Sequence, residues 1–169
     1  YTTSYERYEK LCQREPKNSF HKQNLAIAYC KLGETHTDLG NFPKALTFFE
    51  TYNALEKELY GVNPQNVDFK KGLVISSSKL GLTHSALGNL PKALTFLEES
   101  SRLGKELHEA FPQNVDFKNL LAIAYSKLGS TYTALGNLPQ ALTFFEKDFE
   151  LQKELHAAYP ENVSFKNNL

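Results

Sequence analysis

Histidine is the residue type in this sequence best suited to acid–base chemistry and metal binding, so its spacing is the first test for an enzyme. Four of the five histidines form two series with a 48-residue spacing, and tyrosine takes the third place in each: His36, His84 and Tyr132, and Tyr60, His108 and His156. Neither series contains His-x-x-x-His or Glu-x-x-His, the spacings that gather metal ligands on one helix face. We therefore interpret these histidines as structural or surface residues, with a zinc site shared between two chains as the alternative, and predict no metal ligand.

The other motifs that could carry chemistry have simpler explanations. Cys12 and Cys30 are the only cysteines, too few for a disulfide framework, and neither has a base at a recognisable spacing. The sequon at Asn162 matches a repeated Asn-Val-Asp, so we interpret its asparagine as a helix cap. The repeated Leu-Gly-Asn-Leu-Pro lacks the lysine and hydroxyl residue of a phosphate loop. The sequence thus predicts no catalytic residue and no cofactor.

The composition narrows the class of partner. The chain has 169 residues with 19 basic and 19 acidic side chains, and no run of like charge suggests nucleic-acid or membrane binding. No apolar run reaches the roughly 18 to 20 residues that a spanning helix needs. Two free thiols fit a reducing compartment, so we expect a cytoplasmic protein. The first residue is not methionine and both ends lie in mid-pattern, which suggests an excerpt of a longer chain.

An internal repeat organises the whole chain. Twelve-residue segments of nearly the same sequence begin at Leu39, Leu87 and Leu135, each 48 residues after the last. All seven prolines fall on two positions of this period, so proline marks two boundaries in every copy. The register divides the chain into the end of a preceding second helix (1–15), three repeats (16–63, 64–111 and 112–159) and the start of a further first helix (160–169).

Each repeat predicts two helices of about 20 residues joined by a short turn. In the third repeat, apolar residues recur at spacings of three and four residues over both segments, as on one face of a helix. Asparagine two residues after the first proline can cap the first helix, at Asn18, Asn66, Asn114 and Asn162. Gly40, Gly88 and Gly136 end that helix, an asparagine such as Asn89 bridges, and the second proline lies in the first turn of the next helix. Because the turn is short, the two helices must fold back as an antiparallel pair, and stacked pairs form a solenoid.

The residues at the helix contacts resemble the tetratricopeptide repeat. The third copy meets the family pattern of aromatic, Leu-Gly, aromatic, Gly, large apolar, Ala and aromatic with Tyr125, Leu128, Gly129, Tyr132, Gly136, Leu138, Ala141 and Phe145. The 48-residue period exceeds the usual 34 residues and is similar in style to kinesin light chain repeats. The resemblance implies an all-α fold, a right-handed α-solenoid of antiparallel helix pairs. Independently of the family, the small residues Gly33, Gly81 and Gly129 predict close helix contact that a larger residue would overpack.

The resemblance also implies a binding surface, because first helices of this family line a concave groove across which partner peptides lie. Carried over by register, the groove stripe comprises five positions in each first helix: Gln23, Ile27, Cys30, Glu34 and Thr37; Lys71, Ile75, Ser78, Leu82 and Ser85; and Asn119, Ile123, Ser126, Ser130 and Thr133. Its hydroxyl side chains could bond to a peptide backbone, although small residues also serve close helix packing. Lys31, Lys79 and Lys127 repeat in register and are interpreted as solvated charges beside the groove.

These features predict a non-enzymatic protein–protein interaction scaffold that binds a protein or peptide segment. Two alternatives remain at the level of sequence. The array could be a regulatory or sensor arm of a larger enzyme or signalling NTPase, and its partner would then be a neighbouring domain. It could also self-assemble, because the end of a truncated array exposes an apolar face.

Overall fold

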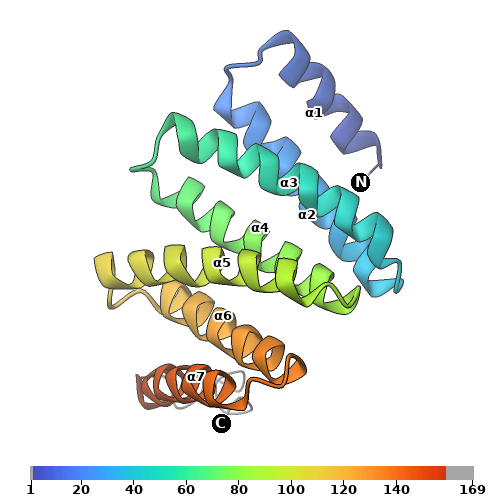
Figure 1. Ribbon diagram of the computed structural model, residues 1–169. Coiled ribbons are helices and arrows are strands. Elements are labelled where there is room, and N and C mark those ends of the chain that lie inside the picture. The colour runs from blue at the N-terminus through green and yellow to red at the C-terminus, as the bar shows by residue number, and fades with distance from the viewer. Residues whose placement is uncertain (1, 159–169) are drawn as a thin grey trace.

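The computed structural model describes residues 2–158, with side chains from Tyr5 onward, and these residues form helices and turns without a strand. The helices follow one another as a stack from α1 to α7 (Figure 1). Their bounds are α1 Thr2–Arg14, α2 Ser19–Asp38, α3 Phe42–Val62, α4 Val67–Ala86, α5 Leu90–Ala110, α6 Val115–Ala134 and α7 Leu138–Ala158. The pairs α2/α3, α4/α5 and α6/α7 pack most extensively, and each pair then packs on the next. The all-α solenoid of helix pairs is confirmed.

An asparagine is the N-cap of each first helix, α2, α4 and α6. The Oδ1 of Asn18 accepts a hydrogen bond from the Phe20 amide at 3.1 Å, and the Oδ1 of Asn66 accepts one from the Asp68 amide at 2.9 Å. Asn114 caps α6 in the same way. Such caps satisfy amides that have no partner within the helix. Asn162, the fourth predicted cap, lies outside the described residues.

The turn inside each pair depends on glycine and asparagine together. Gly40, Gly88 and Gly136 have φ angles of 70°, 75° and 76°, a left-handed conformation that costs glycine little. From the sequence, Asn89 is expected only to bridge the two helices, but it is the N-cap of α5 and its Oδ1 accepts a hydrogen bond from the Lys92 amide at 3.4 Å. Asn41 caps α3 in the same manner. The turn therefore ends one helix and caps the next within three residues.

Small residues bring the two helices of each pair into contact. A Cβ atom on Gly81 would lie 2.6 Å from the Cγ of Leu97, and one on Gly129 would lie 2.6 Å from the Cε1 of Phe145. Gly33 faces the ring of Phe49 in the same way. The alanines that follow in the second helices, Ala45, Ala93 and Ala141, are almost wholly buried. Bulky side chains thus fill the space that glycine leaves on the facing helix.

The second helix of the third pair, α7, has more exposed apolar side chains than α3 and α5 have. On α7, Leu138, Leu142 and Phe149 are 63%, 59% and 51% exposed, and Phe145 is 38% exposed. Phe49 of α3 and Leu97 of α5, which correspond to Phe145, are buried, and α4 and α6 pack against those helices. No helix after α7 is among the described residues. The α7 stripe (Leu138, Leu142, Phe145 and Phe149) is therefore an apolar surface in residues 2–158.

Candidate functional site

The groove stripe predicted from the sequence lies on the accessible side of α2, α4 and α6. None of its fifteen residues is buried, whereas Leu25, Ala26 and Ala28 on the other sides of α2 are. Ile27 is 53% exposed and Ile123 is 38% exposed, and Ile75 between them is half-buried. Because α4 and α6 also contact each other directly, the stripe continues from one first helix to the next.

Three hydroxyl groups in the stripe donate hydrogen bonds to carbonyl oxygens of their own helices. Thr37 donates to the carbonyl oxygen of Gly33 at 2.9 Å, Ser130 to that of Ser126 at 3.0 Å and Thr133 to that of Gly129 at 3.0 Å. A hydroxyl that has donated its proton still offers oxygen lone pairs. These residues are therefore suited to accept hydrogen bonds from peptide amides.

One carboxylate in the stripe joins two first helices. Glu34 of α2 contacts Lys79 of α4 at 3.0 Å and Lys31 of its own helix at 2.9 Å. Burial raises the pKa of Glu34, but the hydrogen bonds and charges of the two lysines outweigh it, so the net pKa is lowered. Lys31 and Lys79 are thus engaged with Glu34, and the expectation that they are simply solvated charges is corrected.

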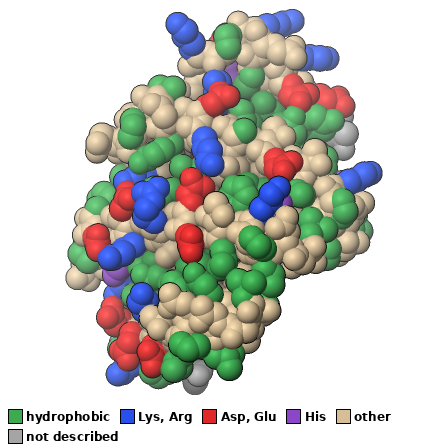
Figure 2. Space-filling view, in the orientation of Figure 1, with side chains coloured by type: hydrophobic (Ala, Val, Ile, Leu, Met, Phe, Trp, Pro, Cys, Tyr) green, Lys and Arg blue, Asp and Glu red, His purple; other side chains and the backbone are tan. Residues whose placement is uncertain are grey.

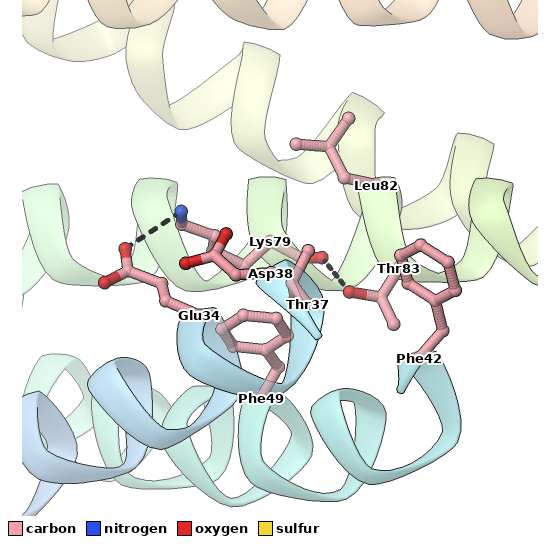
Figure 3. A pocket seen from close by; sticks show the side chains of 8 residues that line it. All are labelled: Glu34, Thr37, Asp38, Phe42, Phe49, Lys79, Leu82 and Thr83. Carbon is pink, nitrogen blue, oxygen red and sulfur yellow. Dashed lines mark hydrogen bonds and ion pairs between the residues drawn. The ribbon is translucent and has the colours of Figure 1, made fainter. Parts of the chain in front are cut away.

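A pocket of about 300 Å³ opens beside this ion pair (Figure 3). Glu34, Thr37 and Leu82 of the predicted stripe line it. Five further residues complete the lining and were not predicted: Asp38, Phe42, Phe49, Lys79 and Thr83. In Figure 3 the rings of Phe42 and Phe49 come from α3, below and beside the acidic side chains of α2, and Leu82 comes from α4. The volume is at the small end of about 300–1,000 Å³ for ligand sites, which suits one or two side chains.

A second hollow of about 430 Å³ lies among α5, α6 and α7, with Leu121, Tyr125 and Leu151 in its lining. Figure 2 shows hydrophobic side chains gathered below α5 in this part of the molecule. One repeat earlier, Lys57 of α3 and Glu99 of α5 approach to 3.6 Å across the equivalent gap. Lys147 replaces that glutamate and instead lies over the rings of Tyr125 and Phe144. The hollow is therefore open where the earlier gap has an ion pair.

The histidines have aromatic neighbours. The rings of His36 and Phe48 stack at 5.3 Å between centroids, and those of His84 and Phe96 stack at 5.5 Å. Tyr132 stacks on Phe144 at the same repeat position. Burial lowers the pKa of His84, and the charge of Lys92 lowers it further.

Within the part of the chain that the structure describes, no group of three His, Cys, Asp or Glu residues is arranged to hold a metal ion.

A repeated ion pair between the two helices of each pair was not predicted from the sequence. Lys22 and Glu58, Lys70 and Glu106, and Lys118 and Glu154 form ion pairs of 2.6, 2.9 and 2.7 Å within the three helix pairs. The constant separation of 36 residues is the signal that could have revealed them. Exposed pairs of this kind contribute at most about 1 kcal/mol each, so they set the register of the pairs more than their stability.

Residues 121–158, which cover most of α6 and α7, match the model of the tetratricopeptide repeat family. The helix pairs α2/α3 and α4/α5 repeat the sequence of this matched segment. Residues 121–158 thus form a tetratricopeptide-type repeat. Repeats of this type make protein-interaction modules, and their fold is generally a non-enzymatic scaffold.

One solved structure has a similar fold. The crystal structure of BtubC (BKLC) from P. vanneervenii is 18% identical in sequence over 93% of this chain, with a TM-score of 0.63. The match covers 57% of the BtubC chain, so the present chain spans little more than half the length of that protein. A crystal structure of MamA is 20% identical over 92% of this chain and 90% of its own, with a TM-score of 0.37. No curated protein matches the sequence significantly.

Within residues 2–158, no helix combines the length and the apolar character that crossing a membrane demands.

Proposed function

We propose that the chain is a non-enzymatic scaffold that binds a segment of a partner protein along the groove stripe of α2, α4 and α6. The observation that carries this proposal is that none of the fifteen stripe residues on three successive first helices is buried, whereas residues such as Ala26, Val74 and Ala122 on other sides of these helices are. Exposed isoleucines and leucine offer apolar contact, and the hydroxyl oxygens offer acceptors for peptide amides. An extended segment finds both kinds of contact at each repeat.

Blocking the middle of the stripe tests this proposal. Ser78→Arg combined with Ser126→Arg places two long cations where a partner backbone would lie, so capture of the partner is expected to be lost. Both serines are only half-buried, and an arginine can direct its charged end to water. The melting temperature is therefore expected to change little. The measurement is a pull-down with the intact protein, peptide mapping of what binds, and comparison of the variants by calorimetry.

A matched control places the same charges on second helices. Thr47→Arg combined with Thr95→Arg changes two exposed residues of α3 and α5 and should leave capture intact. If the groove variant still captures the partner, the groove assignment is wrong. If the control variant loses capture and the groove variant does not, the binding surface lies on the second helices.

Self-association is a second candidate, favoured by the α7 stripe. At the other end of the stack, α1 exposes Glu6, Arg7 and Lys10, which do not complement an apolar face. Contact through α7 would therefore join two copies by like faces, with twofold symmetry, and would not build a head-to-tail filament.

Sedimentation at increasing protein concentration tests this second candidate. The chain is expected to pass from monomer to dimer, and Leu142→Glu combined with Phe149→Glu is expected to keep it monomeric, because each charge would be buried in the contact. A chain that stays monomeric at the highest concentration reached would rule out this candidate.

A further inference from the structure

The pocket beside Glu34 has a charge distribution of its own within the stripe. Its two acidic residues are Glu34 and Asp38; the same repeat positions hold Leu82 and Ala86 in the second copy and Ser130 and Ala134 in the third. Among the three copies within residues 2–158, acidic side chains stand at both of these positions only in the first, at the junction of α2 with α4. Glu34 is held by Lys31 and Lys79, whereas Asp38 is exposed and makes no ion pair among those found in the described residues.

Asp38 also lies where its charge is least favourable for its own helix. It is the last residue of α2, and the carbonyl end of a helix carries a partial negative charge. The last carbonyls are partly occupied by the turn, since the amides of Leu39 and Gly40 donate to Thr35 and Thr37. A cation near this end would interact favourably with both the Asp38 carboxylate and the helix terminus.

The apolar side of the pocket adjoins this charge. Phe42 and Phe49 from α3 and Leu82 from α4 line the same 300 Å³ space as Asp38, and Leu82 is 36% exposed (Figure 3). We propose that this pocket takes an apolar side chain of the partner segment and that Asp38 pairs with a basic side chain next to it. The inference rests on the proposed groove function and gives its partner a chemistry: an apolar residue followed by lysine or arginine.

Capped tetrapeptides provide the probe, because they need only the pocket and not the whole groove. Acetyl-Ser-Leu-Arg-Ser-amide is titrated into the 169-residue chain and followed by amide chemical shifts, alongside peptides in which Glu replaces Arg or Ala replaces Leu. The Leu-Arg peptide is expected to bind best and to shift residues at the C-terminal end of α2 and in the C-terminal half of α4. Asp38→Ala should weaken it up to about fivefold, the range of an exposed ion pair, and bring its affinity close to that of the Leu-Glu peptide.

The substitutions suit the fold and have a matched control. Alanine already stands at the Asp38 position in both other copies, so Asp38→Ala should fold. Asp38→Lys should reverse the preference toward the Leu-Glu peptide, and Glu6→Gln, which removes an exposed carboxylate from α1, should change nothing. Equal binding of the Leu-Arg and Leu-Glu peptides, better binding of Leu-Glu, or the absence of saturable shifts at the pocket would each overturn the inference.

The experiments distinguish a failure of the proposed groove function from a failure of the inference about the pocket. If Ser78→Arg with Ser126→Arg abolishes partner capture but the Leu-Arg peptide shows no preference, the groove function stands and the inference about the pocket falls. If capture survives the arginines, the groove function fails whatever the peptides show.

Discussion

Replacing Glu56 with glutamine is expected to raise the free energy of unfolding by about 3 kcal/mol at pH 8 and to change it little at pH 4. Glu56 is 5% exposed between α3 and α4, and its carboxylate occupies the space where a side chain on Gly72 would lie. Burial raises its pKa to about 7. At neutral and higher pH, folding must therefore either bury a charge or keep a proton that water would remove.

The direction of this pH dependence follows from the protonation of Glu56 in the folded and unfolded states. In the unfolded chain a glutamate titrates near 4.3, so between that pH and about 7 the folded state holds a proton that the unfolded state has lost. The stability associated with Glu56 is fully present below pH 4.3 and is lost as pH rises through 7. Glutamine resembles the protonated acid at every pH, and the third copy already has the buried Gln152 at this position.

Chemical denaturation of both proteins across this pH range measures the difference. Glu58→Gln is the control, because Glu58 is exposed and paired with Lys22, and its effect should stay below about 1 kcal/mol. An equal gain from Glu56→Gln at pH 4 and pH 8 would show that packing and not ionisation is responsible.

The helices could be predicted because their ends depend on local chemistry. Asn66 caps α4 through amides two and three residues away, and Gly88 ends the same helix through its own φ angle. A repeated period then supplies the rest of the fold, since each helix pair must meet a similar neighbour. The accessible stripe follows from the same register, which fixes the side of the helix on which Ile75 or Ser78 lies.

Contacts between pairs could not be predicted in this way, because they depend on how far successive helices shift. Lys79 meets Glu34 across α2 and α4, and no spacing within one helix indicates this pair. The side of the junction that carries the small residue also changes from one pair of repeats to the next. Glu56 of α3 faces Gly72 of α4, but at the next junction the glycine is Gly104 of the second helix, where an added Cβ atom would lie 3.7 Å from the Cα of Leu121. Such exchanges become interpretable only when the facing residues are known.

Gly81→Val is expected to lower the free energy of unfolding by about 2 to 3 kcal/mol, the upper part of the range for overpacking. A Cβ atom at this position would lie 2.6 Å from the Cγ of Leu97 and 3.2 Å from the carbonyl oxygen of Ala93. Leu97 is fully buried, and the carbonyl belongs to the α5 backbone, so neither can move away without disturbing the pair. Gly61→Ala is the control: nothing lies within 4 Å of its Cβ position, and helix propensity should give a gain of up to about 1 kcal/mol.

A double-mutant cycle locates the source of the strain. Leu97→Ala alone removes a buried side chain and should cost about 2 to 5 kcal/mol. In the double variant the valine enters the space that Leu97 leaves, so the total loss should be smaller than the sum of the two single losses. Additive losses would place the strain at the Ala93 carbonyl and the helix backbone, and the spacing of α4 and α5 would then be set by backbone contact and not by the leucine.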